Sequence, residues 1–484
     1  MFSPRHLTLV LWFALALVAA ASLADAAERQ RDQPNILFIF ADDQAFDTVR
    51  ALGNDEIETP NLDALVRQGV TFTHAYNQGG WDGAICVASR TMLMTGRFLW
   101  KANSIYPNTD RDFRQRGRLW PQLLEQAGYD TYFSGKWHLL VDAEKAFQTA
   151  RHIRPGMPNQ TDAGYNRPRE GAADAWTPWE PKFGGFWQGG THWSEVLGND
   201  AVDYLETAQH RDRPFFMYLA FNAPHDPRQS PKRFVDKYPL DNIKTPKSFV
   251  PLHPLDIGSN TIRDEQLAPF PRTEYAVKVN RQEYYAIITH MDEQIGRILK
   301  KLRQTGLAEN TYVFFSADHG LSVGQHGLMG KQNMYDHSVR VPFMVIGPDV
   351  PTGKRIDAPI YLQDVMPTTL DLAGAVKPDH VDYQSVLPLW RGEGKSSYDA
   401  IYGAYLADAQ RMVQQNGFKL ILYPRIKKSL LFDTRRDPLE MHDLSDHPDM
   451  AAQAKSLFAK LQQLQRQTGD QLDLTETFPE LAAN

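Results

Sequence analysis

Four apolar segments recur along the chain, and each is followed at once by charged or titratable residues. Residues 35–41 form a continuous apolar run of the kind that is buried on both faces of a parallel sheet. Residues 129–133, 215–221 and 312–317 repeat the pattern, and helix-like segments such as 61–68 and 283–303 lie between them. This alternation predicts an α/β fold with a large, mostly parallel sheet sandwiched by helices.

Polar side chains stand where each predicted strand ends. Ligands of such folds bind beyond the carboxyl ends of the strands, so we expect these side chains to meet in one site. They are Asp42 and Asp43 after the first strand, Lys136 and His138 after the second, His225 after the third, and Asp318 and His319 after the fourth, with His326 and Lys331 close behind.

The carboxylates at the strand ends predict a metal site. Asp42 and Asp43 are adjacent and repel one another unless a cation neutralises them, and Asp318 offers a third oxygen donor. The alternative for such a pair is a helix N-cap beside a solvent-facing acid. Carboxylate oxygens suit Ca²⁺ or Mg²⁺, and the sequence has neither the cysteine pair nor the paired histidines of a zinc site.

The first 27 residues are predicted to be a cleavable signal peptide. Arg5 and His6 precede an apolar run at 7–21, and Ala24-Asp25-Ala26 is a cleavage motif, with cleavage expected after Ala26. No later run is apolar and long enough to cross a bilayer. We therefore expect a secreted or periplasmic protein without a membrane span.

Cys86 is the only cysteine of this exported chain. Exported proteins normally use cysteines in pairs, so a single one is either a small buried hydrophobic residue or a reactive group. It opens the motif Cys86-Val-Ala-Ser-Arg90, which runs on to Thr95-Gly-Arg97. This motif resembles the signature of the type I sulfatases of the alkaline phosphatase superfamily, with Ala88 in place of the usual proline.

The resemblance extends from Pro34 to about Leu444. In its motifs the chain is most similar to bacterial iduronate- and choline-sulfatase-like enzymes and to polysaccharide sulfatases. It implies that Cys86 is oxidised to formylglycine (3-oxoalanine) by a maturation enzyme. It also implies one Ca²⁺ ion, bound by Asp42, Asp43, Asp318, His319 and the modified Cys86. His319 stands where asparagine is commoner in the family.

The resemblance further implies a sulfatase mechanism, in which the hydrated aldehyde attacks a sulfate ester and forms a sulfo-enzyme intermediate. Arg90 would steady the formylglycine, and Lys136 would contact both it and the sulfate. His138 would be the base that releases sulfate. His225 and Lys331 would bind a sulfate oxygen and protonate the leaving alcohol.

Two further histidines are candidate substrate-binding residues. His192 lies among Phe186, Trp187 and Trp193, which could stack on a sugar ring or could equally be core packing. His326 lies near Lys331 and could line the pocket.

The sequence predicts two domains after the signal peptide. Residues 28–387 would form the catalytic sulfatase domain. Residues 388–484 carry short strand candidates and an amphipathic helix at 450–466, which predict a smaller antiparallel sheet with a helix that completes the pocket. The formal net charge of −6 argues against a nucleic-acid-binding surface. The expected partner is a sulfated saccharide, released from a polysaccharide.

Two other functions remain open from the sequence. A phosphate or phosphonate monoester hydrolase of the same superfamily would share the metal cluster. A catalytically silent protein could retain the fold only to bind sulfated glycans.

Overall fold

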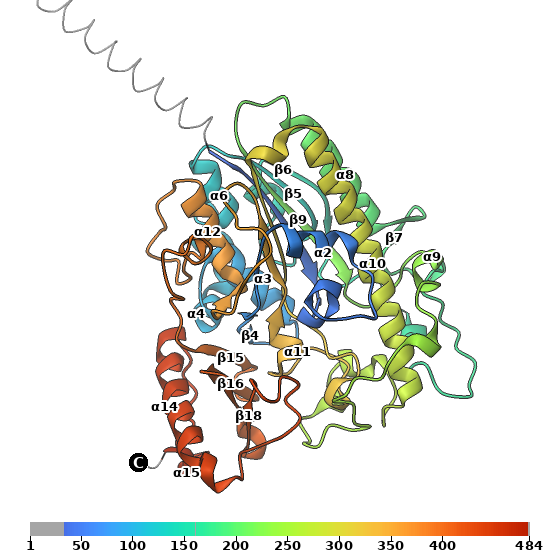
Figure 1. Ribbon diagram of the computed structural model, residues 1–484, viewed down its shortest axis with the longest axis vertical. Coiled ribbons are helices and arrows are strands. Elements are labelled where there is room, and N and C mark those ends of the chain that lie inside the picture. Colours follow the sequence, from blue (N-terminus) through green and yellow to red (C-terminus); the bar gives the residue numbers. More distant parts are fainter. Residues whose placement is uncertain (1–32, 160, 483–484) are drawn as a thin grey trace, which may run out of the picture.

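A computed structural model describes residues 33–159 and 161–482, so the predicted signal peptide lies outside the described residues. The centre of the molecule is an eight-stranded sheet with the strand order β13-β2-β12-β10-β1-β9-β5-β6 (Figure 1). Its strands are β1 (Asn35–Asp42), β2 (Val70–Phe72), β5 (Asp130–Lys136), β6 (Thr149–Arg154), β9 (Phe215–Pro224), β10 (Thr311–Ala317), β12 (Phe343–Ile346) and β13 (Lys354–Ile356).

The parallel centre of the sheet brings the predicted strand ends together. β1 is buried over its whole length and pairs in parallel with β9 on one side and β10 on the other. β5 pairs in parallel with β9. Asp42 is opposite Pro224, and Ala41 is opposite Ala317, so the residues that follow these strands lie at one edge. The expected α/β fold with a large, mostly parallel sheet is confirmed.

The sheet is not parallel throughout. β12 pairs antiparallel with both β10 and β2, and the short strands β2 and β13 complete that side. β5 comes very close to β9 at Gly135, where its register with β6 shifts: Gly135 has φ +105°, and a Cβ atom there would lie 1.9 Å from the carbonyl oxygen of Ala220 in β9. Only glycine fits such a close approach of two strands.

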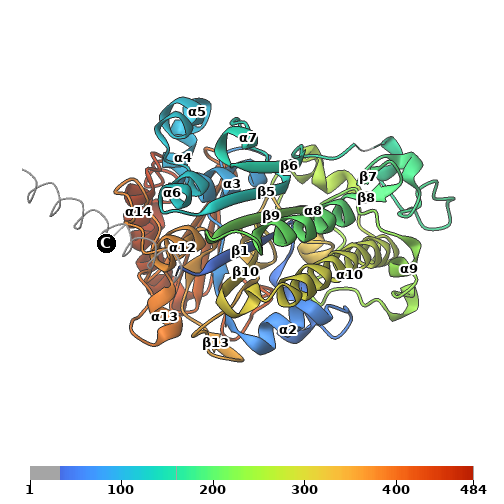
Figure 2. The same cartoon turned by 90° about the horizontal axis from the view of Figure 1, so that it is seen from above.

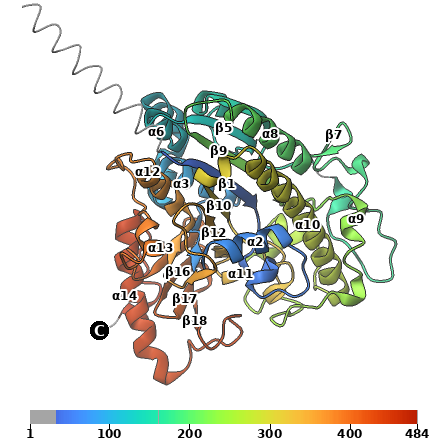
Figure 3. The ribbon, with the colours of Figure 1, turned by 45° about the horizontal axis from the view of Figure 1, so that its top comes forward.

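Helices cover both faces of the sheet (Figures 2 and 3). On one face α8 and α10 pack together and against β9, and α2 packs beside them; α3, α6 and α12 cover the other face. The helices are α2 (Pro60–Gln68), α3 (Ile85–Thr95), α4 (Leu99–Ile105), α5 (Thr109–Asp112), α6 (Trp120–Gln126), α7 (Ala143–Ala146), α8 (Trp193–Ala208), α9 (Lys232–Val235), α10 (Glu274–Gln304), α11 (Asp336–Val339), α12 (Val365–Leu372), α13 (Leu387–Arg391), α14 (Ala451–Thr468) and α15 (Pro479–Ala482).

A smaller sheet of five strands lies beside the main one, in the order β18-β17-β16-β15-β4. β15 to β18 form an antiparallel meander, and α14 packs against it (Figures 1 and 3). The fifth strand, β4, comes from far earlier in the chain, pairs in parallel with β15, and is followed within a few residues by α3. The small sheet is therefore joined to the segment that carries Cys86. Its strands are β4 (Gly79–Gly80), β15 (Ile401–Tyr405), β16 (Gln410–Gln415), β17 (Phe418–Tyr423) and β18 (Lys428–Asp433).

Three pairs of strands stay short. β3 (Ala75–Tyr76) lies between β11 (Arg340–Val341) and β14 (Ile360–Tyr361), and β7 (Trp187–Gln188) pairs with β8 (Thr191–His192). Among the described residues, no helix has the length and apolar character needed to cross a membrane.

Candidate active site

Cys86 is the second residue of α3 and is almost completely buried. It lines a cavity of about 620 Å³. The first turn of a helix presents unpaired N–H groups and the positive end of the helix dipole, which favour an anion at this point. Arg90 lies one turn further along α3 and is fully buried, so the motif places a thiol and a guanidinium on the same helix beside the ends of the strands.

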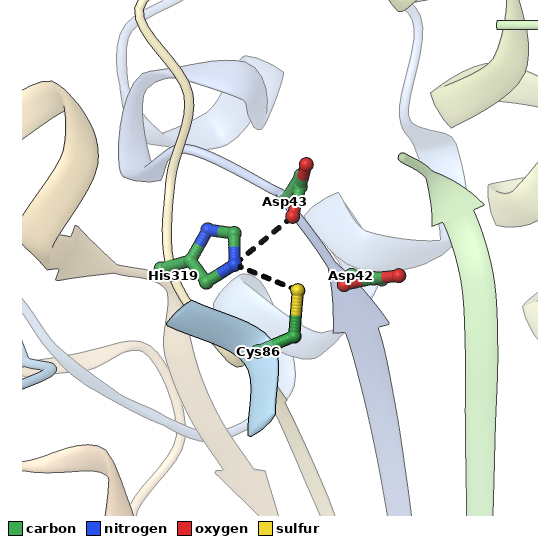
Figure 4. Close-up of side chains that lie close together, drawn as sticks. All are labelled: Asp42, Asp43, Cys86 and His319. Carbon is green, nitrogen blue, oxygen red and sulfur yellow. Dashed lines mark hydrogen bonds and ion pairs between the residues drawn. The ribbon is translucent and has the colours of Figure 1, made fainter. Parts of the chain in front are cut away.

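The carboxylates lie against Cys86, as Figure 4 shows for Asp42 and Asp43. Asp42 ends β1, and Asp43 follows it with a positive φ of 69°. The backbone N–H of Asp43 donates to Asp318 Oδ1 at 3.1 Å. Burial, and next the charge of Asp318, raise the pKa of Asp42 well above its ordinary value. Packing acids this closely in a low dielectric is unfavourable unless positive charge compensates them.

Three buried cations supply part of that compensation. The Lys136 ammonium is bonded to Asp42. Arg90 donates to Asp318 from Nε at 3.1 Å, and its Nη2 lies 3.1 Å from the same carboxylate oxygen. Lys331 Nζ lies 2.9 and 2.8 Å from the two oxygens of Asp43. Burial alone would lower the pKa of Lys136 and of Lys331, but the neighbouring carboxylates raise both.

Four side chains offer ligand atoms for a metal ion. Donor atoms of Asp42, Asp43, Cys86 and His319 all lie within 4.8 Å of one another. Asp42 Oδ1 is buried and, in the described part of the chain, has no hydrogen-bond partner. His319 Nδ1 donates to the Gly320 carbonyl at 2.9 Å, which directs Nε2 toward Asp43, 3.0 Å away, and Cys86 (Figure 4). A metal ion would satisfy the unpaired oxygen of Asp42, and the bond to the Gly320 carbonyl fixes the His319 tautomer that leaves Nε2 free to bind the ion.

The charges around His319 also favour a cation at this position. Burial alone would lower the pKa of His319, but the negative charges of Asp43 and Asp318 outweigh it and raise this pKa to about 9. The carboxylates therefore favour a positive charge beside Nε2. Asp318, the remaining predicted ligand, lies outside the group of four, although its Oδ1 is 3.7 Å from His319 Nε2. The residues present fit a hard divalent cation.

Three of the predicted catalytic side chains line the cavity together with Cys86: His138, His225 and Lys331. His225 Nδ1 donates to the Asp226 carbonyl at 2.6 Å, so its Nε2 is turned away from that carbonyl and lies 3.8 Å from Asp43 Oδ2. Lys331 Nζ lies 3.5 Å from Cys86 Sγ. Burial raises the pKa of the Cys86 thiol, but Lys136 and Lys331 outweigh it and lower that pKa well below its ordinary value.

His138 is held in place by the backbone. It has a positive φ of 57°, and its ring lies so close to Gly156 that a Cβ atom there would be 2.0 Å from Nε2. Burial, assisted by the charge of Lys136, lowers the pKa of His138. This ring is therefore neutral at neutral pH and can accept a proton.

The two predicted substrate-binding histidines do not line this cavity. His192 caps α8: its Nδ1 accepts from the Ser194 N–H at 3.1 Å, and its Nε2 donates to the Gln229 carbonyl at 2.7 Å. His326 donates from Nε2 to the Leu439 carbonyl at 2.9 Å and stacks on Tyr335 at 4.2 Å between ring centroids. Both rings are held by backbone and core contacts, so their predicted contact with substrate has no support in this geometry.

Other residues of the cavity wall were not predicted from the sequence. Arg263 and Asp264 come from the segment before α10, and Gln332 comes from the segment after β10. Tyr405 ends β15, and Arg425 lies in the turn between β17 and β18. The sequence at 236–272 has little periodicity, and the adjacent charges Arg263 and Asp264 within it were a usable signal. Nothing in the sequence near Arg425 distinguished it from an ordinary surface arginine.

Comparison with known proteins decides the family. The family model described as "Sulfatase" matches residues 34–375. The chain belongs to the sulfatase family. A second model, "N-sulphoglucosamine sulphohydrolase, C-terminal", matches residues 324–467. This membership makes the chain a sulfuric ester hydrolase, as the sequence predicted.

Relatives of known name match over nearly the whole length. An N-acetylglucosamine-6-O-sulfatase of Bacteroides thetaiotaomicron is 26% identical, covering 94% of this chain and 90% of that protein. A solved structure in complex with its substrate D-glucosamine-2-N,6-O-disulfate has a TM-score of 0.69 at 22% identity and covers 91% of this chain and 99% of its own. The phosphonate monoester hydrolase of Agrobacterium radiobacter also has a TM-score of 0.69, at 21% identity, over 92% and 97% of the two chains. These two structures share the fold of this sulfatase.

Proposed function

We propose that this protein is a secreted or periplasmic, formylglycine-dependent sulfatase that hydrolyses a sulfate ester on a carbohydrate. One observation carries the proposal: Cys86 lies at the start of α3, in the wall of a cavity, between a carboxylate cluster and His138, His225 and Lys331. Its relatives are named as sulfatases, and one of them is named N-acetylglucosamine-6-O-sulfatase, which supports a carbohydrate substrate. The segment at 1–27 supports export.

Calcium is the proposed metal, with formylglycine made from Cys86 beside it. Asp42, Asp43 and His319 would hold the ion, with Asp318 adjacent. The ion would neutralise the buried carboxylates and stabilise negative charge on the substrate. The hydrated aldehyde would supply two hydroxyl groups on one carbon, one to displace the alcohol from sulfur and one whose deprotonation releases sulfate.

The side chains that line the cavity would bind the sulfate and move the protons. His225 Nε2 and Lys331 Nζ both face Asp43, so both can donate to an oxygen bound there, and one of them protonates the alcohol as it leaves. His138, neutral because it is buried, would take up the proton in the second half of the reaction. Arg90 and Lys136 do not line the cavity but pair with Asp318 and Asp42, and they would hold these carboxylates in place.

The test is a comparison of leaving-group-matched aryl esters with protein made alongside a maturation enzyme. We expect kcat/KM for the aryl sulfate to exceed that for the matching phosphate monoester and phosphonate monoester, and Cys86→Ala to abolish sulfate release. A higher value for the phosphonate would favour the phosphonate hydrolase alternative. Retained binding of sulfated glycans without any turnover would favour the catalytically silent alternative.

A further inference from the structure

Part of the cavity wall is not used by the proposed chemistry. Besides Cys86, His138, His225 and Lys331, its wall includes residues 257–264, the turn after β15 and one residue of the turn between β17 and β18. Two arginines lie there, Arg263 and Arg425. Much of the remaining wall is apolar and includes Ile257, Leu406 and Ala409.

Arg263 is already occupied by protein carboxylates. It donates from Nη1 to Asp226 Oδ2 at 2.6 Å and from Nη2 to Asp226 Oδ1 at 3.3 Å, and Nη2 also pairs with Asp264. Nη1 further contacts the sulfur of Met157 at 3.2 Å. A guanidinium held by two acids in this way is a structural tie between the 257–264 segment and the loop that carries His225, and its capacity to bind a further anion is small.

Arg425 is different. It lies in the turn Pro424–Ile426, and its side chain is 55% exposed. A single oxygen, Asp408 Oδ1, accepts from both Nε, at 2.9 Å, and Nη2, at 2.5 Å. Within residues 33–159 and 161–482, Nη1 has no hydrogen-bond partner. Asp408 thus orients the guanidinium from one side and leaves N–H donors on the other, which is the geometry that binds carboxylate or sulfate.

We propose that Arg425 determines specificity by binding a second anionic group of the substrate, so that the preferred substrate carries a sulfate or carboxylate in addition to the sulfate ester that is hydrolysed. This inference rests on the proposed function. The ester would lie beside Cys86, His225 and Lys331, and the second anion would lie beside Arg425, which lines the same cavity. A cavity of about 620 Å³ is of the size that encloses a small ligand, so one saccharide can contact both groups of residues.

The experiment measures sulfate release from three sets of sugars: hexoses with one sulfate ester at each ring position, the same hexoses with a second sulfate, and sulfated hexuronic acids. We expect the wild-type protein to have its highest kcat/KM on a dianionic sugar, and the disulfate and uronate sets tell which anion Arg425 binds. Arg425→Gln should lower the ratio of kcat/KM between dianionic and monoanionic sugars about 10- to 100-fold, because it removes a charge-assisted hydrogen bond. Arg425→Lys, which keeps the charge but loses the planar fork, should lower this ratio less.

Arg435 provides a matched control. It is 59% exposed, pairs with Asp433 from Nε at 3.0 Å, lies just after the same small sheet and does not line the cavity, so Arg435→Gln should leave the ratio unchanged. The inference is wrong if the best substrate carries a single anionic group. It is also wrong if Arg425→Gln lowers kcat/KM on dianionic and on monoanionic sugars by the same factor. A wild-type protein that hydrolyses aryl sulfate but no dianionic sugar also contradicts it. Failure on every sulfate ester, aryl sulfate included, would instead contradict the proposed function.

Discussion

Replacement of His225 by alanine tests whether this residue protonates the leaving alcohol. The ring is buried, its Nδ1 donates to the Asp226 carbonyl at 2.6 Å, and its Nε2 is directed toward Asp43, where the ester would lie. A sugar alkoxide is a poor leaving group and needs a proton, whereas a nitrophenolate is a stable anion and leaves without one. General acid catalysis is worth about 10²- to 10⁴-fold, so His225→Ala should lower kcat on a sugar sulfate by that factor.

On nitrophenyl sulfate the same variant loses only a hydrogen bond to the sulfate, which is worth about tenfold. The assay is the steady-state release of sulfate from both esters by the wild-type protein and the variant. Truncation leaves the Asp226 carbonyl without its donor, at a cost of about 1–3 kcal/mol of stability, so the melting temperature of the variant is recorded in parallel. His442→Ala is the control, because that ring is 77% exposed. Equal losses on the two esters would refute the role of His225 as the acid.

Three further predictions concern the metal and the buried charges. Chelation should lower both activity and melting temperature, and added Ca²⁺ should restore both. At a hundredfold excess over its Kd, Ca²⁺ should raise the free energy of unfolding by about 3 kcal/mol. Asp42→Asn should lose this response, and a wild-type protein whose activity and melting temperature do not change with chelator would contradict the metal site. Burial lowers the pKa of His326 to about 4. As the pH drops, this histidine therefore takes up a proton in the unfolded chain before it does so in the folded protein. The free energy of unfolding should fall by about 3 kcal/mol between about pH 6.5 and about pH 4. His326→Gln should flatten that slope in urea titrations at several pH values, and an unchanged slope would disprove the assignment. Lys419→Met should cost about 3–5 kcal/mol in the same titrations, because the Lys419 ammonium lies 2.7 Å from Asp336 and 2.6 Å from Glu440 in a buried cluster; a loss below 1 kcal/mol would contradict this.

The parallel strands and the residues at their ends could be predicted because both follow from short-range pattern. A continuous apolar run such as β1 has to be buried on both faces, and charged residues directly after it can lie only at the edge of the sheet. The meeting of Asp42, His225 and Asp318 could therefore be predicted from their positions after the strands, although the long connections between the strands could not. The catalytic roles of these residues stay predictions.

What the sequence did not predict depends on contacts between distant segments. β12 is a four-residue strand whose antiparallel direction is fixed by its neighbours β10 and β2. His192 and His326 look like pocket residues in sequence, but each ring is held by a backbone carbonyl of another segment. Arg425 lines the cavity because the small sheet is joined to the main body, in part by the pairing of β4, which precedes α3, with β15. A sequence pattern carries no information on such pairings.

The most direct test of the central claim is the mass of the tryptic peptide at 68–90, which contains Cys86. The protein should be isolated from its native source, or from a host that carries a maturation enzyme for this motif. We predict a peptide whose mass is lower by the difference between a thiol and an aldehyde side chain, and which reacts with a hydrazide. A peptide from the native protein that retains an unmodified thiol would contradict a formylglycine-dependent mechanism.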